Sequence, residues 1–282
     1  MATKTNETVR RRWRSGIAEW WRRRLARLGQ HQRQIRQPHL QVVVALVTAA
    51  LFSGPVQAPA LSASRETVVL VHGLGGNGWN FRLLAGHLEE AGYSVRQVEY
   101  DSREESLDLI LEEVDRQIAA CCLSEATRVH FVTHSLGSLV LRAHLAGHRP
   151  PGLGRVVMLA PPNQGTEIAD RVGNWRLTRL LVGPLASQLG TGEADLPQRL
   201  PVLDAEFGVV AGSRWVNPLG PLMLSGPHDG TVPVTSTRLR GMTDHVVVPS
   251  SHLGMLSSKH VAAATVRFLQ SGRFDRLNDP PR

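Results

Sequence analysis

The amino-acid sequence predicts an α/β fold built on a mainly parallel β-sheet with helices on both faces. From residue 66 onward, short runs rich in valine and other apolar residues alternate with segments of helical spacing. This alternation is typical of a parallel sheet that is buried on both sides. The chain has 282 residues, of which 42% are hydrophobic, enough to build one large domain or two small ones.

Six apolar runs are expected to form the strands of this sheet, and four segments are expected to form its helices. The predicted strands are residues 68–73, 93–100, 129–135, 155–162, 207–213 and 244–250. The predicted helices are residues 79–91, 104–120, 136–147 and 259–270. No internal repeat and no low-complexity segment is found.

Residues 165–203 interrupt the alternation of strands and helices. They contain several glycines and prolines, apolar clusters at Leu177, Leu180 and Leu181, and no clear strand. An insertion of this length between two strands is more often functional than idle, so it is a candidate cap or lid. An ordinary packed helical hairpin is the alternative. The predicted body covers residues 61–275, followed by a tail at 276–282.

The positive charge of the chain is concentrated at its N-terminus. The formal net charge is +8, and residues 1–37 hold eleven basic and two acidic residues, a net +9. The rest of the chain is therefore close to −1. A nearly neutral body lacks the electrostatic footprint of a nucleic-acid-binding protein, and we expect no nucleic-acid partner.

Residues 1–60 have the pattern of a targeting segment. An uncharged apolar run at 40–52 is shorter than the ~20 residues of a membrane-spanning helix, but it has the length of a signal-peptide core. The small-residue sequence around 56–58 resembles a cleavage site. We expect a signal peptide or a membrane anchor, and hence a body that is exported (periplasmic or extracellular) or anchored to the membrane.

A basic amphipathic pattern precedes the apolar run. Its apolar residues recur at spacings of three to four among arginines, and they are Trp13, Ile17, Trp20, Trp21, Leu25 and Leu28. Such a segment can lie on an anionic membrane surface. The alternative is a solvated arm that satisfies the positive-inside rule.

The two cysteines, Cys121 and Cys122, are adjacent in the sequence. Neighbouring residues rarely reach the geometry of a disulfide, so we interpret both as packing thiols. They predict neither a disulfide framework nor a metal site.

The strongest functional signal is FVTHSLGS, in which Ser135 lies between a predicted strand and a predicted helix. A sharp strand-to-helix turn exposes a nucleophilic serine above the sheet and requires small neighbours. Gly137 meets this requirement, whereas Thr133 stands where the pattern GxSxG has glycine. The alternative is that Ser135 caps the helix.

Glycines after the first predicted strand offer backbone NH groups to a ligand. The string VHGLGGN places Leu74 in this turn, and its NH together with that of Leu136 is expected to bind an oxyanion. The string lacks the Lys and Ser/Thr of a P-loop, and its spacing does not fit GxGxxG. A nucleotide site is therefore not expected.

A candidate acid and a candidate base for catalysis by Ser135 follow it in the chain. Asp229 precedes a glycine in LSGPHDGTVPV, and His252 follows a predicted strand in VVVPSSHLGM. The carboxylate would orient the imidazole, which would act as general base. His245 opens a strand and His260 lies in the last helix, so both are weaker candidates for the base.

From about residue 66 to 270 the chain resembles a bacterial lipase or esterase of the α/β-hydrolase superfamily. The matching strings are VHGLGG, THSLGS, LAPPNQGT, GPHDGTVP and SSHLGM. The resemblance implies the α/β-hydrolase fold with a cap insertion, a triad of Ser135, Asp229 and His252, and oxyanion donors at Leu74 and Leu136. It also implies that His72, Gly73, His134, Asn163 and Gln164 border the substrate.

These expectations describe a serine hydrolase that cleaves carboxylic esters of small-molecule or lipid substrates through an acyl-enzyme, with no cofactor and no metal. Thioester or amide hydrolysis and acyl transfer on the same triad are the alternatives within enzymes. A non-catalytic, membrane-attached binding protein of the same fold is the alternative from another class. The sequence does not indicate an oligomeric state.

Overall fold

A computed structural model describes residues 66–104, 106–122, 128–216 and 220–274. The predictions for residues 1–60 and for the tail at 276–282 lie outside these residues. None of the described helices is long and apolar enough to cross a membrane.

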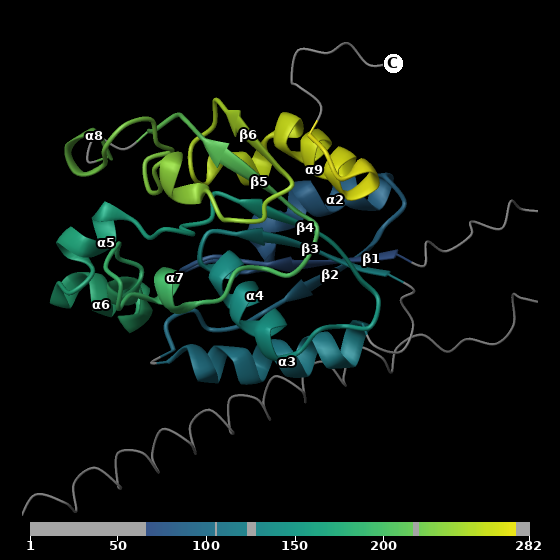
Figure 1. Ribbon diagram of the computed structural model, residues 1–282, viewed down its shortest axis with the longest axis horizontal. Coiled ribbons are helices and arrows are strands. Elements are labelled where there is room, and N and C mark those ends of the chain that lie inside the picture. Colours follow the sequence, from purple (N-terminus) through teal and green to yellow (C-terminus); the bar gives the residue numbers. More distant parts are fainter. Residues whose placement is uncertain (1–65, 105, 123–127, 217–219, 275–282) are drawn as a thin grey trace, which may run out of the picture. The chain divides into compact units, whose positions relative to one another are not determined.

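The described residues form one six-stranded, all-parallel sheet with the order β2-β1-β3-β4-β5-β6 (Figure 1). The strands are β1 (Glu66–Val71), β2 (Ser94–Val98), β3 (Arg128–His134), β4 (Leu153–Leu159), β5 (Phe207–Gly212) and β6 (Asp244–Val248). Each one overlaps a predicted strand, and the predicted α/β class is confirmed. The strand order reverses between β1 and β3, and ligands of such sheets bind outside the carboxyl ends of the strands at this point.

Helices cover both faces of the sheet (Figure 1). One face carries α2 (Arg82–Glu90) and α9 (Lys259–Ser271), and the other carries α3 (Leu107–Cys122) and α4 (Leu136–Gly147). Side chains of a strand point alternately to the two faces. In β1, Val69 and Val71 accordingly join the core cluster under α3 and α4, whereas Val68 and Leu70 join the cluster under α2 and α9.

The segment that follows β4 contains short helices and no strand over residues 165–203. These helices are α5 (Glu167–Val172), α6 (Arg176–Val182), the 3₁₀ helix η3 (Pro184–Gln188) and α7 (Leu196–Arg199). A further short helix, α8 (Gly220–Met223), follows β5. Movement of this insertion as a lid stays a prediction.

The structure corrects the interpretation of the cysteines. Cys121 and Cys122, at the C-terminal end of α3, are joined in a disulfide.

Candidate active site

Ser135 occupies a sharp turn between β3 and α4. It has a positive φ of 52° with ψ of −125°, a conformation that non-glycine residues rarely adopt and that is found at functional turns. Its NH donates to the carbonyl oxygen of Leu159, at the end of β4, over 2.9 Å. The side chain makes no capping hydrogen bond to α4. The alternative role as a helix cap is therefore not supported.

Gly137 allows the first turn of α4 to approach β1. A Cβ atom at this position would lie 2.3 Å from the carbonyl oxygen of Val71 and 2.4 Å from that of His72. Both distances are far below van der Waals contact, and both neighbours are backbone. Glycine is therefore required at position 137 for Ser135 to stand at the sheet edge.

Thr133 replaces the first glycine of the GxSxG pattern without disturbing the turn. Its side chain is fully buried, and its hydroxyl shares a hydrogen bond of 2.7 Å with the hydroxyl of Ser138 in the first turn of α4. Because the serine at 138 is small and polar, it accommodates the β-branched residue. The departure from the pattern is thus compensated within the turn.

His252 and Asp229 are brought together from two loops beside the ends of β5 and β6. The Nδ1 atom of His252 lies 2.8 Å from Oδ2 of Asp229. The other carboxylate oxygen accepts hydrogen bonds from the NH groups of Thr231 and Val232, at 2.9 and 2.8 Å. Asp229 is almost fully buried, and its Cβ packs close to Gly212, the last residue of β5. The carboxylate is fixed, and it holds the imidazole by Nδ1.

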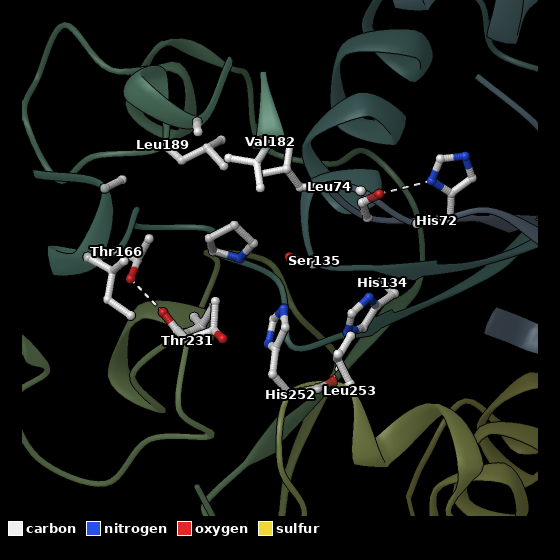
Figure 2. A pocket seen from close by; sticks show the side chains of 18 of the residues that line it. His72, Leu74, His134, Ser135, Thr166, Val182, Leu189, Thr231, His252 and Leu253 are labelled. Carbon is white, nitrogen blue, oxygen red and sulfur yellow. Dashed lines mark hydrogen bonds between the residues drawn. The ribbon is translucent and has the colours of Figure 1, made fainter. Parts of the chain in front are cut away.

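Ser135 and His252 line the same cavity, which has a volume of about 420 Å³. Figure 2 shows the imidazole of His252 directed toward Ser135. Among the residues that the structure describes, no hydrogen bond joins the two side chains. Such contacts are often longer in the free enzyme and tighten when substrate binds.

The NH groups of Leu74 and Leu136 are available as donors beside Ser135. Leu74 lines the cavity, and Leu136 begins α4, where backbone NH groups lack partners within the helix. In the described chain neither NH has an acceptor, whereas the NH of Gly75 donates to the hydroxyl of Ser102 over 2.7 Å. Gly73, which precedes Leu74, packs so close to Ser135 that a Cβ atom at position 73 would lie 2.9 Å from the Cβ atom of Ser135.

The insertion supplies much of the cavity wall. Its contributing residues are Thr166, Ile168, Ala169, Val172, Gly173, Thr178, Val182, Ala186 and Leu189. Leu74, Phe81, Val232, Leu253 and Leu256 add further apolar surface from the body. Most of this wall offers carbon rather than hydrogen-bonding groups. The sequence marks the insertion as a whole but does not single out its wall residues. Other pairs in this segment, such as Arg176 and Leu180, have the same spacing of four residues as Thr178 and Val182 but do not line the cavity.

Two further predicted site residues, His72 and His134, line the cavity. His72 is buried and stacks on Tyr100, with ring centroids 4.2 Å apart. His134 donates from Nε2 to the carbonyl oxygen of His252 over 2.9 Å. Burial, with smaller effects from the neighbouring His252 and His72, lowers the pKa of His134 to about 3. His134 is therefore neutral near pH 7.

Asn163 and Gln164 are not among the residues that line this cavity. Asn163 is a buried residue of the loop after β4, and its amide donates to the carbonyl oxygen of Thr237 over 2.8 Å. The side chain of Gln164 donates to the carbonyl oxygen of Arg238 over 3.1 Å. Both amides hold the loop in place instead of facing Ser135, which differs from the sequence-based expectation.

The alternative bases lie away from Ser135. His245 is in the first half of β6, and its Nε2 shares a hydrogen bond with the hydroxyl of Thr237. His260 is exposed on α9. Neither is among the residues that line the cavity.

A cluster of potential metal ligands lies elsewhere, on α3 and at the end of α4. Asp115, His144 and His148 offer ligand atoms within 4.8 Å of one another, and the carboxylate bonds to both rings. None of the three lines the cavity.

A family model for the alpha/beta hydrolase family matches residues 68–265. The chain belongs to this family. The matched range includes Ser135, Asp229 and His252 together with the loop that carries Leu74. In a comparison with curated proteins, no sequence matches significantly.

Solved structures with a similar fold include bacterial hydrolases. The mature lipase BlEst2 from Bacillus licheniformis is 20% identical, with a TM-score of 0.59, over 78% of this chain and 96% of the lipase. Phospholipase PlaB from Legionella pneumophila is 17% identical, with a TM-score of 0.57, over 73% of this chain and 60% of the phospholipase. The metagenomic carboxyl esterase MGS0156 is 17% identical, with a TM-score of 0.54, over 69% and 66% of the two chains. These similarities establish the fold of this alpha/beta hydrolase.

Proposed function

We propose that the chain is a serine hydrolase that cleaves carboxylic esters with an apolar, lipid-like acyl group. The observation that carries the proposal is the position of Ser135. It stands in a strained turn at the edge of an apolar cavity that it shares with His252, and Asp229 holds the imidazole by Nδ1. Such a constellation activates a serine for attack on a carbonyl group.

In the proposed reaction, the hydroxyl of Ser135 attacks the ester carbonyl while Nε2 of His252 takes the hydroxyl proton. The NH groups of Leu74 and Leu136 stabilise the negative charge that develops on the carbonyl oxygen. His252 then returns the proton to the departing alcohol. In the second half, a water gives a proton to His252 and attacks the acyl carbonyl. The bond between the acyl carbon and Oγ of Ser135 then breaks, the acid leaves, and His252 returns the proton to Oγ.

The chemistry of the cavity supports an apolar acyl group as the bound part of the substrate. Its wall is formed largely by aliphatic side chains of the insertion, including Ala169, Val172 and Val182. Sites of this kind bury a ligand against apolar side chains and use few polar groups to orient it. The similarity in fold to a lipase, a phospholipase and a carboxyl esterase agrees with an ester substrate.

A fluorophosphonate probe tests the nucleophile. We expect the probe to label the full-length protein at one serine and the Ser135→Ala variant at none. Ser257→Ala removes an exposed serine near His252 in the sequence and serves as the matched control, which should label normally. Labelling of the folded Ser135→Ala variant would refute the assignment.

A panel of p-nitrophenyl esters of graded acyl length tests the reaction class. We expect hydrolysis that rises with chain length until the cavity is filled and that is lost in Ser135→Ala. The corresponding thioesters test thioester hydrolysis, and the corresponding anilides test amide hydrolysis. Addition of an alcohol to the ester assay tests acyl transfer. A substantially higher kcat/KM for one of these reactions would replace ester hydrolysis as the assigned function.

We further propose that residues 1–60 direct the hydrolase body to the far side of the cytoplasmic membrane. The support is the basic segment followed by the short apolar run at 40–52. Protease treatment of intact cells after permeabilisation of the outer envelope should digest the body. A body that is protected until the inner membrane is lysed would contradict this proposal.

A further inference from the structure

Helix α6 has one side that lines the cavity and another that is exposed and carries large apolar side chains. Thr178 and Val182 lie four residues apart, so they share one side of the helix, and both line the cavity of Ser135. Leu177 and Leu180 leave 63% and 77% of their surface exposed, and Trp175, immediately before the helix, leaves 61%. Exposed apolar side chains that gather on one surface mark sites of interaction with proteins or membranes. The outer side of α6 therefore presents uncovered apolar surface.

Two arginines accompany these exposed apolar side chains. Arg176 and Arg179 are exposed. Arg176 lies four residues before Leu180 and therefore shares its side of the helix, and Arg179 directly precedes Leu180. No acidic residue occurs between Trp175 and Val182. We call Trp175, Arg176, Leu177, Arg179 and Leu180 the α6 surface.

We propose that the α6 surface docks on an anionic lipid bilayer and places the mouth of the cavity against the lipid. The inference rests on the proposed function only for the substrate, a lipid ester that would enter the cavity from the bilayer. Segments that lie in the bilayer interface combine leucine and tryptophan with basic residues, whose charge is attracted to anionic headgroups. The α6 surface has this combination, and the opposite side of the same helix lines the cavity.

The charge of the α6 surface argues against two other occupants. The N-terminal segment of this chain carries a net +9 over residues 1–37, so its charge opposes binding to Arg176 and Arg179. A second copy paired through the same surface would bring four arginines together with no carboxylate from this stretch between them. An anionic bilayer satisfies both the apolar side chains and the positive charge.

An environment-sensitive dye on the helix tests the docking directly. The two native cysteines are joined in a disulfide, so a Leu180→Cys substitution provides a single thiol for a nitrobenzoxadiazole label. The full-length chain also carries Ser135→Ala, which prevents lipid turnover. Vesicles of phosphatidylcholine with about a quarter of phosphatidylglycerol supply the anionic surface. We expect the label to shift to the blue and to brighten with these vesicles, and to respond less at high salt.

The matched control carries the label at Leu109→Cys on α3, where the native leucine is 46% exposed. We expect no spectral change at this position, even where the basic N-terminal segment binds the same vesicles. The label at 180 distinguishes docking of the body from attachment of that segment alone. An unchanged spectrum at 180 while the chain sediments with vesicles would overturn the proposal.

Removal of the positive charge tests the role of the arginines. Arg176→Gln and Arg179→Gln are combined in the chain labelled at 180. Each arginine near an anionic surface contributes about fivefold to partitioning, so the vesicle concentration for half-maximal response should rise by more than tenfold. A response that depends on protein concentration without vesicles would identify a second copy as the occupant and overturn the proposal. Fluorophosphonate labelling of Ser135 in the unsubstituted chain tests the catalytic assignment separately.

Discussion

His134 donates a hydrogen bond from its Nε2 atom to the backbone carbonyl oxygen of His252, over 2.9 Å. The two rings also contact each other, with centroids 4.7 Å apart. The residue immediately before the proposed nucleophile thus holds the backbone of the proposed base. Because burial keeps His134 neutral, this contact adds no positive charge beside the imidazolium that forms on His252.

His134→Ala should lower kcat about 10- to 100-fold with little change in KM, because a small displacement of a catalytic group is costly. His134→Gln offers an amide donor and should recover part of the loss. Steady-state kinetics on a short ester measure both variants. Full kcat in a folded His134→Ala protein would show that the contact does not position His252.

The stability of the protein should fall in acid through His134. Its pKa is about 3 in the folded protein and near 6.5 when unfolded. Between these values the unfolded chain binds a proton that the folded chain does not, so the free energy of unfolding decreases as the pH falls. From about pH 7 to pH 5 the loss from this group is about 2 kcal/mol. The loss of unfolding free energy between pH 7 and pH 5, measured by urea unfolding at each pH, should be smaller by this amount in His134→Gln. An equal loss in the two proteins would contradict the prediction.

Asp229→Asn should preserve the fold and lower kcat by about 10⁴-fold, the size known for the equivalent change in a serine protease. The amide no longer favours the tautomer of His252 that can accept a proton at Nε2. Glu193→Gln, an exposed position in the insertion, is the control and should be fully active. An Asp229→Asn enzyme within tenfold of the wild type would exclude this carboxylate as the orienting acid.

Gly137→Ala should destabilise the fold, because the added methyl group meets the carbonyl oxygens of Val71 and His72. A loss of about 1–3 kcal/mol is expected from forced overpacking. Gly147→Ala, at the other end of the same helix, meets no atom within 4 Å and should be neutral or slightly stabilising. Thermal unfolding of the pair measures the difference, and equal melting temperatures would contradict the packing argument.

Ala169→Leu should shorten the cavity from the side of the insertion. Ala169 is buried and lines the wall, so the larger side chain takes space that a long acyl chain needs. We expect kcat/KM to fall about tenfold or more for long esters, in line with ~0.8 kcal/mol per excluded methylene, and to change little for acetate. Ala119→Leu, exposed on α3, is the control. An unchanged chain-length profile would mean that the acyl group binds elsewhere.

The sheet and the order of the proposed catalytic residues could be predicted because both depend on local pattern. Runs such as VVLVHG are apolar enough to define a buried strand, and the turns after them necessarily lie at one edge of a parallel sheet. Ser135 and His252 therefore come to one cavity, and Asp229 meets His252, as the sequence indicates.

The remaining features depend on side-chain direction, which a one-dimensional pattern does not contain. Asn163 and Gln164 follow β4 as expected, yet their amides bond to the carbonyl oxygens of Thr237 and Arg238. The cavity wall contributed by Val172 and Val182 depends on how short helices pack over the sheet. The bond between the adjacent cysteines likewise depends on local geometry at a helix end.

The hydroxyl pair of Thr133 and Ser138 has a consequence for recognising similar chains. A search pattern that insists on glycine two positions before the nucleophile would discard this sequence, although its turn is intact. The physical requirement joins two positions: a threonine at the first calls for a small hydroxyl-bearing or otherwise compact residue five positions later. We therefore expect the side-chain sizes at positions 133 and 138 to be anticorrelated across related hydrolases. Either position considered alone would then appear to tolerate both small and large residues.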